Sequence, residues 1–451
     1  MKKHFITGAL TLAAAALSAA TLDIVPAEFK IYKVGEPVTF KVTAKCDKGK
    51  LMTAGTFAVK VTDSGKTPIG KPVQIDLAKG NPTSFTVKLD RPGFILAAAT
   101  NCTLRDNKTI KWSRKGFAPL AGAAVEPEKI KAGAERPADF NKFWQDGVKA
   151  YKNAEVIVTP APELAKIIEP VKNLKERLAG YNFYRVESKF ADKSGSITGF
   201  LVVPAAPGKY PIIAGVPGAG PGTIYPGASY FSGKPAIQLF MNVHPYPTAS
   251  TGAEQKKRYN EYNKSLQTPQ GIKRIYTMYK ADNRDEYIYR KVWLALNRAL
   301  EHVMTMKEFD GKNIAAVGSS QGGGSALALA GINSKVTCVV ANVPALCDHG
   351  GWKAGRAPGW PRLHNNWKGK ADAAAAYFDG ANFAMNIKAP ALVSVGYIDV
   401  TCSPSSVYAA YNNLAGKKSI YPMYRIGHTA TADFSRQRPN SWMSSFSVNK
   451  K

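Results

Sequence analysis

One short segment of the chain has the residue types and spacing of a serine nucleophile. Residues 318–322 read Gly-Ser-Ser-Gln-Gly, a pattern in which a sharp turn lifts the serine off the end of a strand. A short apolar strand is predicted at 313–317, and a helix that begins with small residues at 323–330. Small residues suit this turn because its backbone is strained and the helix must pass close to the strand. We therefore predict that Ser320 is a nucleophile.

A serine hydroxyl is a weak nucleophile at neutral pH, so it needs a histidine to accept its proton and a carboxylate to orient that histidine. Chains with this turn carry the three residues in the order serine, acid, histidine. Of the six histidines, only His428 follows Ser320 at a separation that leaves room for an acid on its own strand. It stands in a loop after an apolar strand predicted at 419–423. The alternative is a surface histidine without a chemical role, and the residue order favours the catalytic one.

The acid is predicted at the end of another apolar strand. Residues 391–399 end in Asp399, and a helix is predicted to follow as far as residue 413. An aspartate at this point can also be a helix cap or a turn residue. Because Ser320 and His428 call for a carboxylate between them, we predict that Asp399 orients the histidine.

Two backbone N–H groups must hold the negative oxygen that forms when a serine attacks a carbonyl carbon. The first is expected from Gln321, the residue after the nucleophile. For the second we predict Ala219, in the glycine-rich turn 218–222 that follows a strand at 210–216. A phosphate-binding loop is the competing interpretation of this turn, but no Lys-Ser or Lys-Thr pair follows the glycines.

The elements that would position these residues alternate between strands and helices after residue 137. This alternation predicts an α/β fold with a mostly parallel sheet and helices on both of its faces. A long helix is predicted at 285–306, directly before the strand of the nucleophile. The strands are predicted at 184–190, 196–204, 210–216, 237–243, 314–317, 336–341, 391–395 and 419–423.

The N-terminal part has a different pattern. Short alternations of apolar and polar residues, interrupted by turns, predict a small all-β, immunoglobulin-like sandwich at 21–118. Cys46 and Cys102 lie within it, so we predict either a disulfide between them or two buried free thiols. An odd total of five cysteines leaves at least one unpaired or paired between chains. No metal site is predicted, because the chain lacks a C-x-x-C motif or a histidine pair at ligand spacing.

The first twenty residues predict export. Lys2 and Lys3, an apolar stretch at 9–17 and small residues up to Ala20 form the pattern of a signal peptide. No later segment has eighteen uninterrupted apolar residues, so no integral membrane span is predicted. We therefore predict an exported, periplasmic or extracellular protein. Its parts would be a signal peptide at 1–20, a sandwich at 21–118 and a catalytic domain at 119–451, with a linker rich in proline and alanine at 118–137.

The chain is strongly basic, with 61 Lys and Arg residues against 32 Asp and Glu residues and a formal net charge of +29. Such a charge can attract acidic polymers. The basic residues are scattered through both domains, and an exported protein rarely meets nucleic acid as a substrate, so nucleic-acid binding is disfavoured. An acidic polysaccharide, an anionic cell surface or a simply solvated protein surface fits the charge better.

Three segments together resemble a known family. They are residues 282–287 (Asp-Asn-Arg-Asp-Glu-Tyr), the glycine run at 322–324, and residues 399–404 (Asp-Val-Thr-Cys-Ser-Pro). These segments are similar to motifs of the acetyl xylan esterase and cephalosporin C deacetylase family. The resemblance extends from about Val125 to about Thr429 and leaves the sandwich outside. It implies an α/β-hydrolase fold, a Ser-Asp-His triad at the positions of Ser320, Asp399 and His428, and removal of acetyl groups from sugar hydroxyls without a cofactor.

The chain departs from the family pattern at two places, one of them the glycine-rich turn 218–222. Where the family carries an Arg-Gly-Gln motif, residues 244–246 read His-Pro-Tyr, and Ala219 stands at the place of a tyrosine. We predict that His244 and Tyr246 bind substrate, although for any single tyrosine in the stretch 237–290 packing as core is the favoured interpretation. These departures leave open which acetylated glycan is the substrate. They also leave open the family's ring-shaped hexamer, which the added sandwich could block.

Two other functions compete with a carbohydrate acetylesterase that uses a Ser-His-Asp acyl-enzyme mechanism. A peptidase of the prolyl oligopeptidase type also places such a triad after a β-rich region, but about a hundred residues are too few for a propeller. A non-catalytic glycan-binding protein with a degenerate hydrolase domain is the second alternative. The apparently intact triad argues against it.

Overall fold

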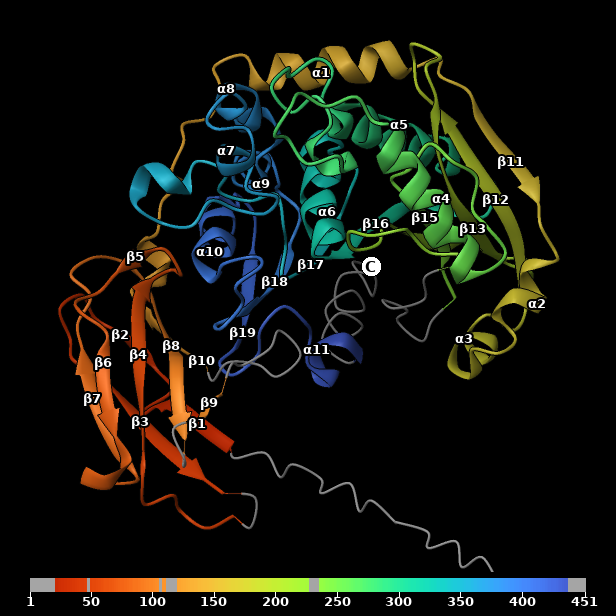
Figure 1. The fold of residues 1–451 in the computed structure, drawn as a ribbon. Helices are drawn as coiled ribbons and strands as arrows, with labels where there is room; N and C mark the ends of the chain where they lie inside the picture. Colours follow the sequence, from red (N-terminus) through yellow and green to blue (C-terminus); the bar gives the residue numbers. More distant parts are fainter. Residues whose placement is uncertain (1–20, 47–48, 105–107, 111–119, 227–234, 437–451) are drawn as a thin grey trace, which may run out of the picture.

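The structure is a computed structural model that describes residues 21–46, 49–104, 108–110, 120–226 and 235–436. The predicted signal peptide at 1–20 lies outside these residues. Figure 1 shows an all-β unit, coloured red to orange, beside a larger unit in which a sheet is covered by helices. Within the described ranges, no helix combines the length and the apolar character that are needed to cross a membrane.

The all-β unit contains two sheets that enclose a core of their own. Antiparallel strands β1, β3 and β7 form the first sheet, and the second has the order β2-β10-β8-β4-β5, with β6 on β4 and β9 on β8. Alternate residues of the strands point into the core, including Phe40 on β3 and Val59 on β4. The strand bounds are β1 Thr21–Pro26, β2 Ile31–Tyr32, β3 Val38–Lys45, β4 Gly55–Asp63, β5 Thr67–Pro68, β6 Val73–Asp76, β7 Thr83–Val87, β8 Gly93–Leu104, β9 Lys108–Ile110 and β10 Leu120–Val125.

Strand β10 corrects the domain boundary that was expected after residue 118. Its segment was predicted to be part of a linker, yet β10 pairs antiparallel with β8 and parallel with β2 inside the sandwich. Its sequence, Leu-Ala-Gly-Ala-Ala-Val, is linker-like because the strand has little room for side chains. A Cβ atom added at Gly122 would lie 2.2 Å from the carbonyl oxygen of Tyr397 in the larger unit. The sandwich therefore continues to Val125.

Of the two alternatives for Cys46 and Cys102, a disulfide or two buried free thiols, the structure shows a free thiol at Cys46, which is only partly buried. Cys46 is a free thiol directly after β3, whereas Cys102 lies on β8 of the other sheet, and its side chain is outside those that the structure describes. The spacing of two cysteines in a sequence does not reveal which sheet of a sandwich each will join.

The larger unit is built on one sheet with the strand order β11-β12-β13-β15-β14-β16-β17-β18-β19. Six neighbouring strands, in the order β15-β14-β16-β17-β18-β19, are parallel to one another. Strands β11, β12 and β13 are added antiparallel at the edge beside β15. The bounds are β11 Val156–Pro160, β12 Tyr181–Lys189, β13 Ser196–Pro204, β14 Tyr210–Gly215, β15 Ile237–Met241, β16 Phe309–Ser319, β17 Cys338–Asn342, β18 Ala391–Gly396 and β19 Lys418–Met423. All eight predicted strands are present, and β11, a largely exposed edge strand, was missed.

Helices cover both faces of this sheet, as the alternation of elements predicted. Successive residues of the parallel strands point to opposite faces, so that Ala316 joins the core beneath the larger helices and Val317 joins a second core with Phe434. The predicted helix at 285–306 is α5. The main helices are α1 Phe140–Tyr151, α2 Leu164–Ile168, α3 Lys172–Arg177, α4 Gly252–Ser265, α5 Ile288–Val303, α6 Gln321–Ile332, α9 Gly380–Ala384, α10 Pro404–Asn413 and α11 Ala432–Arg436.

Candidate active site

Ser320 lies on a tight turn between strand β16 and helix α6. Its φ of 56° and ψ of −119° place it in a region that residues with a side chain rarely occupy, which holds the hydroxyl clear of the strand. The neighbouring glycines are required by space. A Cβ atom at Gly318 would lie 2.2 Å from the backbone of Gly322, and one at Gly322 would lie 2.2 Å from the carbonyl oxygen of Val216. The small residues of the turn thus have the steric reason expected from the sequence.

The structure brings Ser320, His428 and Asp399 together at the carboxyl edge of the sheet. His428 follows β19, and its Nε2 lies 2.8 Å from Oγ of Ser320. Its Nδ1 lies 2.7 Å from Oδ2 of Asp399, which follows β18. A carboxylate can only accept, so Nδ1 carries the proton and Nε2 is left to accept from the serine.

Asp399 is buried and has several hydrogen bonds. Its exposed fraction is 2%. Oδ1 accepts from the backbone N–H groups of Thr401 at 2.8 Å and Cys402 at 3.0 Å, while Oδ2 faces the histidine. These bonds compensate for the loss of water around the carboxylate and fix the oxygen that orients His428.

The buried thiol of Cys402 also lies beside this pair. Atoms of Asp399, Cys402 and His428 that could bind a metal ion lie within 4.8 Å of one another. Burial, followed by the nearby charge of Asp399, raises the pKa of the thiol well above its ordinary value. A thiol must lose its proton to bind a metal ion, so this group favours a hydrogen-bonded triad over a metal centre.

A pocket of about 770 Å³ opens at Ser320 and His428. Ala219 lines it, and Gln321 is the first residue of α6, whose N-terminal N–H groups lack acceptors within the helix. Ala219 thus lines the same pocket as Ser320, and Gln321 directly follows Ser320 in the chain. Sequence reasoning missed the aromatic lining, because its members come from separate loops and elements: Tyr225, Phe240, Trp360 and Phe434.

The side chain of Gln321 points away from the pocket into a buried polar cluster. Its Oε1 accepts from the hydroxyl of Tyr289 at 2.6 Å and from that of Tyr276, and its Nε2 donates to the carbonyl oxygen of Pro217 at 3.3 Å. The amide therefore connects the start of α6 to the start of the oxyanion loop, which comprises residues 217–223.

His244 and Tyr246 were predicted to bind substrate, but neither of them lines the pocket. Both instead form hydrogen bonds with the backbone of the oxyanion loop. Nε2 of His244 lies 2.7 Å from the carbonyl oxygen of Gly220, and the hydroxyl of Tyr246 donates to that of Pro221 at 2.9 Å. The two rings stack with centroids 4.9 Å apart. His244 has an exposed fraction of 0%, so direct contact with substrate is contradicted. The chain after β15 turns inward here, which its sequence does not reveal.

Burial lowers the pKa of His244 to about 4 and keeps its imidazole neutral. Because the Gly220 carbonyl can only accept, Nε2 carries the proton, while Nδ1 is buried without a hydrogen-bond partner among the described residues. Most tyrosines of the stretch 237–290 pack around this histidine as core. Tyr276, Tyr287 and Tyr289 are fully buried, and the rings of Tyr259 and Tyr262 contact His244 edge-on.

Replacement of His244 by glutamine tests the neutral state of the imidazole. The amide of glutamine can donate to the same carbonyl but does not titrate. Since the pKa of His244 in the folded protein lies below its ordinary value of 6.5, the unfolded chain takes up the proton first as the pH falls. Wild type should therefore lose roughly 3 kcal/mol more stability than His244→Gln between pH 6.5 and about 4.

Urea unfolding of both proteins at several pH values measures this difference. His349, which is also buried with a lowered pKa, is present in both proteins, so its effect cancels. Parallel stability profiles for the two proteins between pH 7 and pH 4 would show that His244 is not held neutral.

Comparison with known proteins identifies the family of the chain. A sequence model described as acetyl xylan esterase (AXE1) matches residues 126–446. The acetyl esterase Axe7A of Xylanibacter ruminicola is 32% identical over 399 residues, which cover 86% of this chain and 82% of that protein. The matched 86% of this chain is longer than the part that follows residue 125. The similarity therefore extends into the sandwich, whereas the motifs indicated that it would begin at about Val125.

Two solved structures show the same fold in the larger unit. The acetyl xylan esterase from Paenibacillus sp. R4 is 24% identical with a TM-score of 0.57, and acetyl xylan esterase 1 from Thermoanaerobacterium sp. JW/SL YS485 is 20% identical with a TM-score of 0.55. Each match covers 71% of this chain and 98% of the solved one. The larger unit has the α/β-hydrolase fold, and the chain belongs to the acetyl xylan esterase (AXE1) family of carboxylic ester hydrolases.

Proposed function

We propose that this chain is an exported serine esterase that removes acetyl groups from the sugar hydroxyls of a polysaccharide or oligosaccharide. Ser320 would be the nucleophile, His428 the general base and acid, and Asp399 the residue that orients the histidine. The observation that carries this proposal is the continuous hydrogen-bonded path from Asp399 through His428 to the serine hydroxyl, opening on a pocket.

In the first half of the reaction, Oγ of Ser320 attacks the acetyl carbonyl carbon while Nε2 of His428 takes its proton. The tetrahedral intermediate then collapses, and the same Nε2 gives the proton to the departing sugar oxygen. The acetyl group is left on Ser320 as an ester. Asp399 stabilises the imidazolium during this step because its carboxylate accepts from Nδ1 at 2.7 Å.

In the second half, water takes the place of the sugar. His428 accepts a proton from the water as its oxygen attacks the acetyl carbon. The bond between that carbon and Oγ of Ser320 then breaks, Oγ takes the proton back from His428, and acetic acid leaves and ionises to acetate in solution. In both halves the negative oxygen would be held by the backbone N–H groups of Gln321 and Ala219. Loss of one such donor typically raises the barrier by roughly 3 kcal/mol.

The pocket supports a carbohydrate acetyl ester as the substrate. It is wide and partly aromatic, and rings such as Trp360 and Tyr225 offer apolar faces on which a sugar could stack. The acetyl group of the substrate is small and uncharged, and no ionised side chain is needed to hold it. A relative named acetyl esterase and family members named acetyl xylan esterases support the same chemistry. Export is supported by the leader pattern at 1–20.

The proposed triad predicts large losses of rate from two single substitutions. Ser320→Ala removes the nucleophile and should abolish acetate release. Asp399→Asn removes the acceptor that fixes the histidine tautomer and should lower kcat by roughly 10⁴-fold with little change in folding. Acetate release from acetylated xylan and thermal unfolding of each variant provide the two measurements.

Two matched controls sharpen this test. The chain has a second His-Asp pair, in which Nδ1 of His364 lies 2.9 Å from Asp372, outside the pocket, so Asp372→Asn should keep kcat near that of wild type. A fluorophosphonate should still label Ser320 in Ser319→Ala but not label Ser320→Ala. If Ser320→Ala still released acetate at the wild-type rate, the proposal would be wrong.

The competing peptidase function predicts a different substrate profile. Incubation with acetylated xylan, acetylated pectin, mucin-type glycans and a panel of peptide amides should give acetate from at least one glycan and no peptide cleavage. Ionic strength should be varied in the same assay, because attraction between the basic surface and an acidic glycan weakens with salt. Cleavage of a proline-containing peptide at a rate comparable to deacetylation would favour the peptidase.

A further inference from the structure

We propose that the N-terminal sandwich is a positioning element of the active site, because it packs on the two loops that carry Asp399 and His428. This inference rests on the catalytic roles proposed above for those two residues. It assigns the sandwich a role in the rate of the reaction, whether or not the sandwich also binds a glycan.

The loop that carries Asp399 is packed against strands β8 and β10. The ring of Phe94 on β8 meets that of Tyr397 edge-on with centroids 5.1 Å apart, and it also contacts Tyr408 on α10. Phe94 is buried in the core of the larger unit, although it belongs to a strand of the sandwich. On β10, Gly122 lies so close to the carbonyl oxygen of Tyr397 that a Cβ atom would be only 2.2 Å away from it.

A small cavity shows that the sandwich borders the acid itself. It has a volume of about 120 Å³, and Ser64, Phe94 and Leu96 of the sandwich line one side of it. Tyr397, Asp399 and Val400 line the other side. Only this small space therefore separates these sandwich residues from the proposed catalytic acid.

The loop that carries His428 has its own contacts with the sandwich. Phe29 lies against Tyr424 with ring centroids 5.3 Å apart, and Tyr424 in turn meets Tyr397 at 5.0 Å. Arg425, three residues before the histidine, donates to Asp23 on β1 at 2.6 Å. The aromatic contacts thus join both catalytic loops to each other and to the sandwich.

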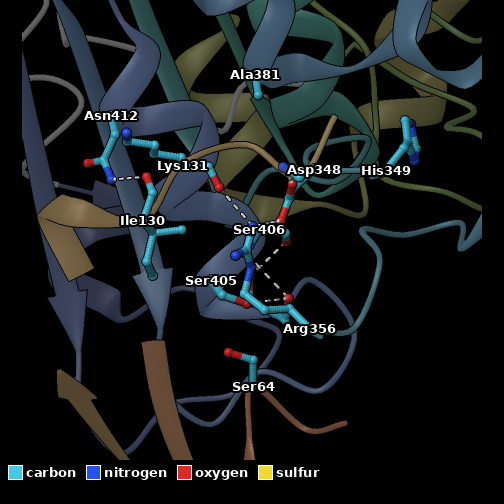
Figure 2. A network of polar contacts seen from close by, with 12 residues as sticks. Ser64, Ile130, Lys131, Asp348, His349, Arg356, Ala381, Ser405, Ser406 and Asn412 are labelled. Atoms are coloured by element: carbon cyan, nitrogen blue, oxygen red, sulfur yellow. Dashed lines mark hydrogen bonds and ion pairs between the residues drawn. The ribbon is translucent and has the colours of Figure 1, made fainter. Parts of the chain in front are cut away.

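The joint between the two units is fixed by buried polar contacts (Figure 2). Arg356 pairs with Asp348 at 2.9 Å and donates to the carbonyl oxygen of Lys131 at 2.8 Å, and both charged side chains are buried. Asn412 on α10 donates to the carbonyl oxygen of Ile130 at 2.8 Å. These bonds hold the backbone that follows β10 against the larger unit.

Such packing matters because a triad acts only at short range. A shift of about 1 Å in a catalytic group can cost a rate factor on the order of 10². Strands β18 and β19 end just before the two loops, so the sheet alone does not fix the positions of Asp399 and His428. The sandwich contacts both loops from outside the sheet, through Phe94 on Tyr397 and Phe29 on Tyr424.

The test compares two phenylalanines of the sandwich in the full-length protein. Phe94→Ala removes the ring that packs on Tyr397. Phe85→Ala removes a buried ring that stacks on Phe40 within the sandwich core, away from both catalytic loops. Both variants open a cavity and should lower Tm. Only Phe94→Ala should lower kcat on 4-nitrophenyl acetate, by roughly 10-fold or more with KM nearly unchanged, and Phe94→Leu should recover part of the loss.

A second variant and its control, both at exposed residues of the sandwich, test the inference if Phe94→Ala does not fold. Phe29 and Ile31 have exposed fractions of 48% and 52%, so replacing either with alanine leaves the cores intact. Phe29→Ala removes the ring beneath Tyr424 and should lower kcat and slow fluorophosphonate labelling, whereas Ile31→Ala should do neither. Wild-type kcat in folded Phe94→Ala and in Phe29→Ala, or equal losses in each variant and its control, would overturn the inference.

Failure of the proposed function would give a different result. If Ser320→Ala kept full activity, the triad would be wrong whatever the sandwich variants did. If Ser320→Ala were inactive while Phe94→Ala and Phe29→Ala kept wild-type kcat, the triad would stand and only the positioning role would fall.

Discussion

The proposed active site depends on the hydrogen bond between Oδ2 of Asp399 and Nδ1 of His428, whose two atoms are 2.7 Å apart. This bond selects the tautomer in which Nε2 can accept the proton of Ser320. Because Asp399 is buried, the carboxylate would be costly to keep charged without its donors, and the N–H groups of Thr401 and Cys402 provide them. The rest of the structure must bring these groups from separate strands to one point.

Two units share that task. Parallel strands β16, β18 and β19 end at one edge of the sheet and deliver the serine, the acid and the histidine in this order. The buried side chains of His244 and Gln321 hold residues 217–223 through hydrogen bonds to the carbonyl oxygens of Gly220 and Pro217. From outside the sheet, the sandwich contacts Tyr397 and Tyr424, which lie two residues before Asp399 and four residues before His428 in the chain.

The sequence predicted well those features that depend on local patterns of residues. The turn around Ser320, the strand that precedes Asp399 and the order of the residues pointed to three side chains that the structure places within hydrogen-bond distance of one another, and eight strands followed from short apolar runs. Features that depend on packing between distant segments were missed. The segment of strand β10 resembles a linker in sequence, partly because Gly122 must fit against Tyr397. His244 was predicted to bind substrate because no local pattern shows that its side chain is buried against the carbonyl oxygen of Gly220.

The central claim is that Ser320 carries the acetyl group during turnover. Rapid acid quenching of the enzyme with 4-nitrophenyl acetate, followed by peptide mass mapping, tests it directly, because the good leaving group makes acylation fast relative to hydrolysis of the acetyl-enzyme. We expect one acetyl group per molecule on the peptide that contains Ser320, formed together with the burst of nitrophenolate. A stoichiometric acetyl group on another side chain, or a burst without acetylation of Ser320, would contradict the account.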